Sequence, residues 1–380
     1  MKLLYTIGSI TQTGGTEKVF ANKANYFVEK LGYEVHLLVN EINGKPAYHY
    51  SDKIIIHNMN VTQYLDKIVV PFWSYNRLIK KLYKPYTAKI KEINPDVIVV
   101  LQHSTDDFII PVLKLDIPTV REFHFSKKAV FSLISEMKNS LSKLRVFGQK
   151  SRLFRFIEKY DYVVLLTEAD QKFSNYPNKS VIIPNVLDIE HVAERDFSED
   201  YKRVISVGSM HDDRKGFDKQ INIWKKINAK YPDWKLDIYG DGASRKDLQQ
   251  LIDVNNLTNI VSLKGTTDQV EEEFRKSSFF LFTSKAEGLP MVMLEAMSCG
   301  LPCVSYDCPD GPADIIDNNE NGYLIDMNDE LTMIAKISYL IENKEEIERM
   351  GNNAQHSAKS YLPDSIIPKW VEFFNSIKKK

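Results

Sequence analysis

Residues 284–302 read SKAEGLPMVMLEAMSCGLP, a loop that leads into a helix and a helix stop. The apolar run 279–282 comes directly before it and has the pattern of a buried strand. Pro290 suits the first turn of the helix, because its missing N–H would have no partner there. Gly300 followed by Pro302 ends the helix. A strand, loop and helix in this order leave free backbone N–H groups at the helix start, and these groups favour an anion.

Two glutamates flank the expected anion site. Glu287 lies in the loop, and Glu295 lies eight residues further on, inside the helix. A phosphate held by backbone amides, with carboxylates on either side to accept hydroxyl groups, is what a sugar nucleotide requires. Two glutamates at this spacing also occur by chance on solvated helices, so the surrounding sequence has to decide. The expected donor-binding segment consists of Gly288, Leu289, Pro290 and Met291.

The composition is that of a folded protein with an uneven charge. Hydrophobic residues make up 43% and charged residues 27% of the 380 residues, which allows two domains with well-filled cores. Residues 1–190 carry 26 Lys and Arg against 19 Asp and Glu, whereas the remainder carries 24 against 32. No nucleic-acid recognition motif accompanies the basic half, so we expect a phosphate-bearing or membrane-bound substrate and no nucleic acid.

Nothing in the sequence predicts export or insertion into a membrane. There is no stretch of about 20 apolar residues, and the first ten residues, MKLLYTIGSI, read as a strand rather than a secretion signal. The 3 cysteines lie close together without a metal-ligand pattern, which favours reduced, buried thiols. We therefore expect a cytoplasmic protein, with a peripheral place at the inner face of the plasma membrane if the basic half binds lipid.

Alternating strand and helix patterns predict two doubly wound α/β domains. Residues 3–7 and 34–39 read as strands on either side of a helix that begins near Thr16 and ends at Gly32. This is a βαβ unit, the start of a parallel sheet. A polar, acidic stretch at 186–201 reads as a linker. We assign 1–188 to an N-terminal domain, 202–361 to a C-terminal domain and 362–380 to a helix that packs back on the N-terminal domain.

The remaining strand patterns follow the same logic. Residues 75–93 and 342–360 read as helices, and 366–377 carries an apolar face at helical spacing. Since ligands bind beyond the carboxyl ends of parallel strands, we expect the loops 8–15 and 284–290 to face the same crevice. Further buried-strand patterns lie at 54–56, 97–101, 119–123, 162–166, 181–183, 204–207, 235–239, 260–263, 278–282, 303–306 and 323–325.

The stretch 287–304, EGLPMVMLEAMSCGLPCV, resembles the signature of retaining glycosyltransferases of the GT-B fold, sequence family 4. The hallmark of that family is a pair of glutamates separated by seven residues. The next block, YDCPDGPADII followed by NGYLI, is also similar to the family, and the resemblance extends over nearly the whole chain. It implies the GT-B fold, in which two Rossmann-like domains face each other across a cleft.

Two further motifs resemble the family. The motif GGTE at 14–17 looks like its N-terminal glycine loop, which implies that Gly14 and Gly15 let the backbone approach the donor's diphosphate and sugar. Alone, two glycines before a helix would indicate only a turn. The motif YGDG at 239–242 also resembles the family, as a tight turn at the end of a strand.

The block 207–218 resembles the family's diphosphate-binding block but departs from it. Ser209 stands where the family has an arginine, whereas Lys215 is well placed and Arg214 beside it can supply the second positive charge. The alternative for Lys215 is an ordinary surface lysine at a helix start. That position disfavours a cation unless an anion is nearby.

Two histidines follow strand patterns in the N-terminal half. The resemblance implies that His124, in the sequence REFHFS, lies near the acceptor and the donor sugar. A half-buried histidine with satisfied partners is an equally good interpretation. His103 is a weaker candidate, in a Gln-His-Ser-Thr loop.

The stretch 127–159 contains nine Lys and Arg and two Glu, with apolar and aromatic residues interleaved. Such a stretch can lie on an anionic bilayer. Two ordinary helices that bury their apolar residues in the first domain would have the same pattern.

The resemblance implies a mechanism and a set of roles. No Asp-x-Asp triplet is present, so we expect a metal-independent reaction without a cofactor. Lys215 and Arg214 neutralise the departing diphosphate, Glu295 accepts the ribose hydroxyls, and Glu287 accepts hydroxyls of the transferred sugar. The family retains the anomeric configuration, by attack on the front face with the leaving phosphate as base.

The resulting prediction is a retaining glycosyltransferase that moves a hexose or N-acetylhexosamine from a nucleotide sugar, UDP-linked in the commonest case. The acceptor is a glycan or a lipid-diphosphate-linked glycan in surface polysaccharide or glycolipid synthesis. Two alternatives remain at this point: a nucleotide-sugar hydrolase or epimerase with a GT-B-like fold, and a non-catalytic sugar-nucleotide-binding protein.

Overall fold

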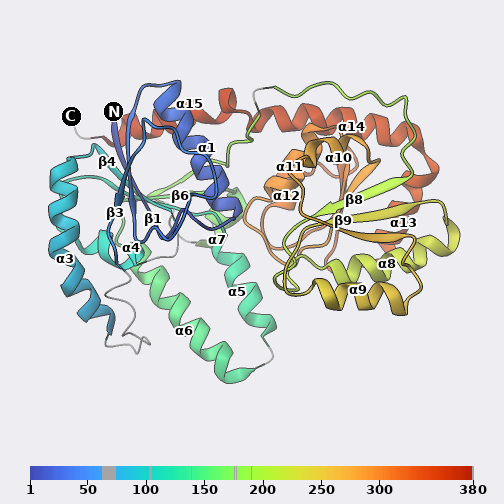
Figure 1. The fold of residues 1–380 in the computed structure, drawn as a ribbon, viewed down its shortest axis with the longest axis horizontal. Helices are drawn as coiled ribbons and strands as arrows, with labels where there is room; N and C mark the ends of the chain where they lie inside the picture. Colours follow the sequence, from blue (N-terminus) through green and yellow to red (C-terminus); the bar gives the residue numbers. More distant parts are fainter. Residues whose placement is uncertain are drawn as a thin grey trace. The chain divides into compact units, whose positions relative to one another are not determined.

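The computed structural model describes residues 1–61, 74–101, 105–137, 139–174, 176, 178–189 and 191–378. These residues form two compact units, each built on a parallel sheet with helices beside it (Figure 1). The first unit comprises Met1–Lys127, Ile134–Asp188 and Ile366–Lys380, and the second comprises Lys128–Leu133 and Ile189–Ser365.

The first sheet has seven parallel strands in the order β3-β2-β1-β4-β5-β6-β7. Its order reverses between β1 and β4, and this switch point is where doubly wound sheets bind ligands. The strands are β1 (Lys2–Ile7), β2 (Glu34–Val39), β3 (Ile55–Asn58), β4 (Val97–Val100), β5 (Thr119–Glu122), β6 (Tyr162–Leu165) and β7 (Ser180–Ile182). The helices are α1 (Gly15–Glu29), α3 (Ser74–Ile93), α4 (Asp106–Ile109), η1 (Ile110–Val112), α5 (Lys127–Glu136), α6 (Ser140–Ile157), α7 (Glu168–Ser174) and α15 (Pro363–Ile377).

The second sheet repeats this arrangement with six parallel strands in the order β10-β9-β8-β11-β12-β13. Its switch point lies between β8 and β11. The strands are β8 (Arg203–Val207), β9 (Lys235–Tyr239), β10 (Val261–Gly265), β11 (Phe279–Phe282), β12 (Cys303–Tyr306) and β13 (Gly322–Ile325). The helices are α8 (Phe217–Lys230), α9 (Arg245–Val254), α10 (Val270–Arg275), α11 (Met291–Ser298), α12 (Pro312–Ile315), α13 (Glu330–Glu342), α14 (Lys344–Ala358) and η2 (Lys359–Tyr361). The predicted fold class, two doubly wound α/β domains, is confirmed.

The two faces of the first sheet pack against different helices. Tyr5 of β1 belongs to a core with α1 and α15, whereas its neighbour Leu4 belongs to a core with α3. The alternation follows from the two-residue period of a strand. On α15 the apolar residues all lie in the first of these cores, so the last helix shares one face of the sheet with α1. These residues are Ile366, Ile367, Trp370, Phe373, Phe374 and Ile377.

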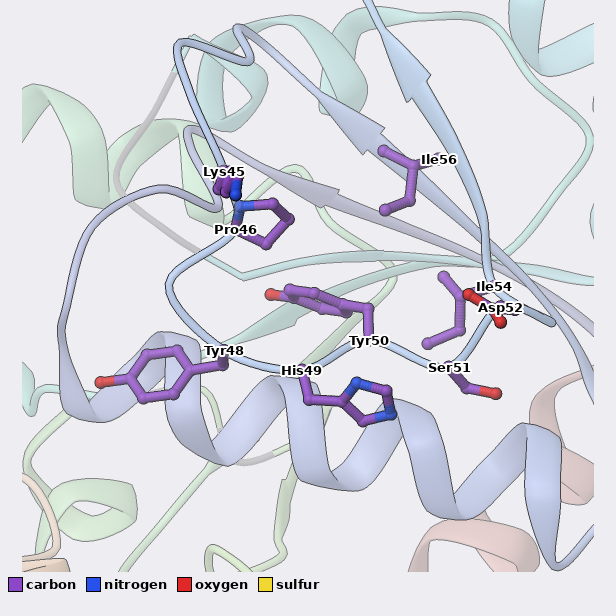
Figure 2. Close-up of a pocket in the computed structure, with 9 residues that line it drawn as sticks. All are labelled: Lys45, Pro46, Tyr48, His49, Tyr50, Ser51, Asp52, Ile54 and Ile56. Atoms are coloured by element: carbon purple, nitrogen blue, oxygen red, sulfur yellow. The ribbon is translucent and has the colours of Figure 1, made fainter. Parts of the chain in front are cut away.

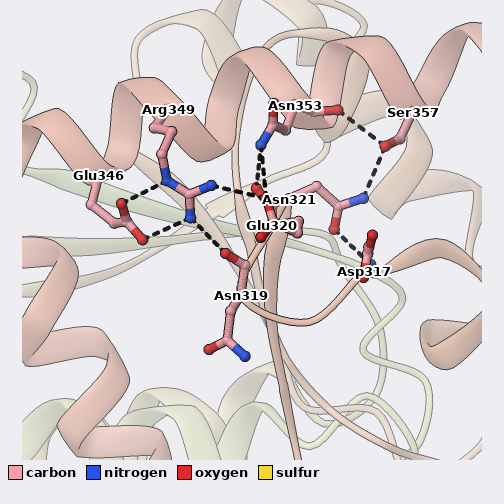
Figure 3. A network of polar contacts seen from close by, with 8 residues as sticks. All are labelled: Asp317, Asn319, Glu320, Asn321, Glu346, Arg349, Asn353 and Ser357. Atoms are coloured by element: carbon pink, nitrogen blue, oxygen red, sulfur yellow. Dashed lines mark hydrogen bonds and ion pairs between the residues drawn. The ribbon is translucent and has the colours of Figure 1, made fainter.

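The charged segment 342–360 is helical as predicted, apart from Asn343. Helix α13 ends at Glu342 and α14 begins at Lys344, because Asn343 leaves the helical backbone conformation with φ of −130° and ψ of 82°. Arg349 of α14 then bonds Glu346 and also Glu320 in the turn before β13, at 3.0 Å from Nη1 to Oε2 (Figure 3). The charges of α14 therefore tie the helix to a turn of its own unit.

Among the described residues, no helix combines the length and the apolar character needed to cross a bilayer.

Candidate functional site

The switch point of the second sheet brings two of the predicted residues together. β8 and β11 are neighbouring parallel strands, with Val204 opposite Phe279. The loop after β8 carries Lys215, and the loop after β11 carries Glu287. Because parallel strands end at the same edge, two loops that are far apart in the sequence form one site.

Two cations share one carboxylate oxygen at this site. Lys215 Nζ lies 2.7 Å from Glu287 Oε1, and Arg214 Nη1 lies 3.0 Å from the same atom. Arg214 also donates to the carbonyl of Ala286 at 3.3 Å. The cluster therefore brings two cationic side chains to one carboxylate, an arrangement suited to an anionic ligand.

Glu287 is a buried anion. Its side chain is 9% exposed. Burial alone would raise the pKa of this carboxyl, but the charges of Lys215 and Arg214 and the hydrogen bond from Lys215 outweigh it and lower the pKa. Glu287 is thus ionised at neutral pH and can accept hydrogen bonds from hydroxyl groups.

The backbone around Lys215 is held by β11. Thr283 Oγ1 donates to the carbonyl oxygens of Lys215 at 3.1 Å and Gly216 at 2.9 Å. Gly216 has φ of 67°, and a Cβ at this position would lie 2.4 Å from the carbonyl oxygen of Thr283. A Cβ at Gly208 would lie 3.1 Å from Lys215 Cγ, so the lysine side chain runs across a glycine. The fixed backbone and the space above Gly208 together direct the side chain of Lys215 toward Glu287.

Helix α11 spans the residues that the sequence predicts, with Pro290 at its N-cap rather than inside its first turn. Glu295 is half-buried, in the second half of the helix. Gly288 and Pro290 pack against Gly311, where a Cβ would lie 2.7 Å from the Gly288 carbonyl oxygen and 2.5 Å from Pro290 Cδ. The block that follows β12 therefore buttresses the loop before α11.

Ser209 lies apart from these contacts in its own turn. Its side chain is exposed, and its hydroxyl accepts the N–H of His211 at 3.3 Å. The cation next to Lys215 in the Glu287 cluster is Arg214.

In the first unit, Gly14 and Gly15 differ in what surrounds them. Gly14 is the N-cap of α1, and a Cβ there would lie 2.3 Å from Glu17 Oε2. A Cβ at Gly15 would meet nothing within 4 Å. The Glu17 side chain thus lies against Gly14, whereas Gly15 has free space beside it.

A pocket of about 540 Å³ lies along the connection between β2 and β3, which passes beside α1 (Figure 2). The hydroxyl of Tyr48 donates to the carbonyl of Gly14 at 3.1 Å, so one wall of the pocket is joined to the glycine loop. None of the predicted site residues lines it. The lining residues are Lys45, Pro46, Tyr48, His49, Tyr50, Ser51, Asp52, Ile54 and Ile56.

His124 lies just beyond the carboxyl end of β5, with a side chain that is 6% exposed. Its Nε2 is 3.4 Å from Glu122 Oε1. Burial lowers the pKa of the imidazole to about 4; Glu122 opposes this shift, and Lys23 and Arg121 add to it. The ring is therefore neutral at pH 7. The other histidine candidate, His103, lies outside the described residues.

Glu122 has a buried partner that no sequence motif marks. Lys23 of α1 forms an ion pair with Glu122, and each side chain is 2% exposed. The sequence indicates the burial of Lys23 only through its position. Lys23 lies three residues after Phe20 and four before Phe27, on the apolar face of α1.

The basic stretch 127–159 forms α5 and α6, which bury part of their apolar residues and expose the rest. Val130 and Phe154 are buried, whereas Leu144 is 70% and Phe147 is 49% exposed. Neither of the two sequence interpretations therefore describes the whole stretch.

Two family descriptions match the chain in succession. Residues 13–191 match Glycosyltransferase Family 4, and residues 188–357 match Glycosyl transferases group 1. The amylovoran biosynthesis glycosyltransferase AmsD of Erwinia amylovora is 26% identical over 98% of this chain and 99% of its own length.

Two further comparisons cover nearly the whole chain. The N-acetylgalactosamine-N,N'-diacetylbacillosaminyl-diphospho-undecaprenol 4-alpha-N-acetylgalactosaminyltransferase of Campylobacter jejuni is 25% identical over 94% of each chain. A crystal structure of a Staphylococcus aureus TarM variant in complex with fondaparinux, alpha-GlcNAc-glycerol and UDP has a TM-score of 0.75. It is 16% identical and covers 98% of this chain and 99% of that chain, so the likeness is one of fold.

Proposed function

The chain belongs to the glycosyltransferases of family 4 with the GT-B fold, and we propose that it moves a hexose or N-acetylhexosamine from a UDP-sugar to a glycan or lipid-diphosphate-linked acceptor. The relative from Erwinia amylovora is named for amylovoran biosynthesis, and the name of the relative from Campylobacter jejuni contains a diphospho-undecaprenol-linked acceptor. Both names support a role in surface polysaccharide or glycolipid synthesis.

The cluster of Lys215, Arg214 and Glu287 carries the donor half of the proposal. In it Lys215 and Arg214 face the diphosphate, and Glu287 accepts hydroxyls of the sugar to be transferred. Glu295 of α11 accepts the ribose hydroxyls. The backbone amides of Gly288, Leu289 and Met291, with Pro290 setting the start of α11, complete the phosphate site.

The proposed reaction retains the anomeric configuration and uses no metal ion. The bond from the anomeric carbon to the diphosphate oxygen breaks, and a bond from that carbon to the acceptor oxygen forms on the same face. The acceptor's proton passes to the leaving phosphate oxygen. Lys215 and Arg214 stabilise the charge that develops on the diphosphate, which is electrostatic catalysis by a site already in place.

A peripheral membrane position at the cytoplasmic face of the plasma membrane is the second part of the proposal. The first half of α6 exposes Leu144 and Phe147, with the exposed Arg145 between them. Exposed apolar side chains next to cationic ones suit an anionic bilayer surface. Co-sedimentation with vesicles that contain anionic lipid tests it. We expect salt-sensitive binding that is lost when both Leu144 and Phe147 are changed to serine; equal binding by the variant contradicts this part.

Donor binding is tested by thermal shift with UDP-, GDP- and ADP-sugars. A ligand at a hundredfold excess over its Kd stabilises the folded state by about 2.7 kcal/mol, which is readily detected. We expect a shift with a UDP-sugar and a smaller one in Lys215→Ala. No shift with any of these sugars contradicts the proposal.

A further inference from the structure

A buried ion pair lies next to His124. Lys23 comes from α1, Glu122 from the last position of β5, and His124 from two residues beyond it. Glu122 Oε1 pairs with Lys23 Nζ and also lies 3.4 Å from His124 Nε2. One carboxylate oxygen thus lies next to both a helix cation and the imidazole, although neither ring nitrogen has a hydrogen-bond partner among the residues that the structure describes.

The lysine is enclosed by aromatic rings rather than by water. Its Nζ lies 3.9 Å from the ring centroid of Trp370 on α15 and 5.6 Å from that of Tyr5 on β1. Rings at this distance attract a desolvated cation. Burial lowers the pKa of Lys23, and the charge of Glu122 opposes that shift. The ammonium therefore depends on Glu122 as its ionic partner.

Stability gives a weak reason for this arrangement. An ion pair in a core is commonly no better for stability than apolar residues of the same size, whereas removing one partner leaves a costly buried charge. In addition, Glu122 Oε2 is buried and finds no hydrogen-bond partner among the residues that the structure describes. Because the ion pair adds little to stability, and because Glu122 Oε1 lies close to the imidazole, we infer that the pair acts on the charge and position of the His124 ring.

We propose that Lys23 and Glu122 are positioning residues for His124. Their opposite charges, next to the ring at the carboxyl end of β5, together set its position and its charge. The inference rests on the proposed function only in so far as His124 serves the transfer reaction. The groups that influence the charge of the ring are Glu122, Lys23, Arg121 and Asn185. The charge of Arg121 is already balanced by Asp107, which lies 2.5 Å away. Substitutions of Lys23 and Glu122 therefore change the charge near the ring most directly.

The charges of Lys23 and Glu122 predict whether each substitution raises or lowers the pH at which His124 titrates. Lys23→Met leaves the carboxylate of Glu122 uncompensated beside the ring, which favours the imidazolium. Glu122→Gln leaves the ammonium of Lys23 without its partner, and this positive charge disfavours the imidazolium. In the double variant both charges are gone, and burial again dominates. We therefore expect the pH at which His124 titrates to rise by about one to three units in Lys23→Met, to fall in Glu122→Gln and to return toward its original value in the double variant.

The test is a histidine-selective NMR titration of the full chain, with the His124 signal among the 8 histidines assigned by its loss in His124→Asn. Lys89→Met, which removes a partly exposed lysine paired with Glu92 on α3, is the matched control and should leave the His124 titration unchanged. If His124 titrates at the same pH in Lys23→Met as in the unmodified chain, the inference is wrong.

A second comparison holds even if Lys23→Met does not fold. The double variant differs from Glu122→Gln only by the charge of Lys23, so His124 should titrate at a higher pH in the double variant. Equal titration in these two variants overturns the inference. Neither result depends on activity. If the titrations move as expected while the acid limb of kcat/KM does not, the role of His124 in transfer fails and the positioning of its ring stands.

Discussion

Lys215 and Arg214 approach the same oxygen of Glu287, so the carboxylate holds two long cationic side chains in place before any ligand arrives. A flexible lysine loses rotamer freedom when it is fixed on a ligand. Here much of that loss has already occurred, because Thr283 fixes the backbone and Gly208 leaves a path for the side chain. A site organised in this way stabilises developing charge without rearranging during the reaction.

Lys215→Ala should therefore impair catalysis far more than folding. We expect kcat to fall by about 10²–10³, equivalent to about 2.7–4 kcal/mol of transition-state stabilisation, by analogy with the loss of one oxyanion donor. Steady-state transfer assays check this, with Lys219→Ala as the control, since Lys219 is a lysine of the neighbouring α8 that bonds Asn328 on the surface. Near-normal turnover in Lys215→Ala would show that the lysine has another role.

Glu287→Gln should lower thermal stability in a pH-dependent way. The folded-state pKa of Glu287 lies below its ordinary value of 4.5, so its ionised form stabilises the fold above that pH. This contribution is lost as the pH falls from 4.5 through the lower folded-state pKa. The difference in Tm between Glu287→Gln and the unmodified chain should thus be full at pH 7 and shrink below 4.5. A difference that does not change with pH would rule out the ion pairs as its cause.

Gly15→Ala separates folding from donor binding. The added methyl meets open space at the start of α1, and alanine favours a helix over glycine by up to about 1 kcal/mol, so stability should stay equal or rise. KM for the nucleotide sugar should rise if the backbone approaches the donor there. Gly148→Ala, at a helix position with equally open space, is the control and should leave KM unchanged. An unchanged KM in Gly15→Ala would remove the glycine loop from the donor site.

Some residues of the candidate site can be predicted from the sequence, whereas others cannot. Glu287 could be named because it lies between a strand pattern and a helix start, and Lys215 because the block 207–218 resembles the diphosphate-binding block of the family. The pair of Lys23 and Glu122 is separated by 99 residues and leaves no local signal except a lysine on an apolar helix face. Nor does the sequence tell that Arg214, rather than Ser209, reaches the carboxylate, because that depends on how the loop turns.

At the scale of elements, the strands were predictable and the helix boundaries less so. Strands covered on both faces read as short apolar runs, and each predicted run lies on an observed strand to within a residue or two. The segment 342–360 was predicted as one helix, and α14 with η2 covers it from Lys344 onward; only the start differs, because Asn343 separates α13 from α14. A single residue that caps two helices is hard to distinguish from a polar residue on a continuous helix.

Helix α14 buttresses α11 through a close contact between glycines. A Cβ at Gly351 would lie 2.5 Å from the carbonyl oxygen of Gly300, just past the end of α11, and 2.7 Å from the ring of Phe197. Gln355, one turn further along α14, donates to the carbonyl of Ser298 at 3.1 Å. The orientation of α11, and with it of Glu295, therefore depends on α14.

Gly351→Ala should destabilise the protein although alanine is the better helix former. Overpacking of this kind costs about 1–3 kcal/mol, more than the gain in helix propensity. Chemical denaturation should show a lower unfolding free energy for Gly351→Ala and an equal or higher one for Gly148→Ala, the same change on an open helix surface. If both variants gain stability, the contact between α14 and α11 is looser than described.

At the scale of the whole molecule, the fold class followed from the sequence because two series of alternating strands and helices are separated by one acidic stretch. Both sheets have the strand order expected of doubly wound domains. The apolar face of 366–377 showed that the last helix must be buried, but only the fold reveals that it shares a core with α1. Part of the acidic stretch is also fixed, since Arg195 donates to the Gly300 carbonyl at 3.1 Å.

The central claim is that this chain transfers sugar to an acceptor, and the direct measurement is nucleotide release from a UDP-sugar with and without a lipid-diphosphate-linked glycan. The chemistry proposed for Lys215, Arg214 and Glu287 requires an acceptor hydroxyl to displace the nucleotide. We predict that release accelerates many-fold with the acceptor and that labelled sugar is recovered on it. Release at the same rate without acceptor, with free sugar as the product, would identify a hydrolase and contradict the account.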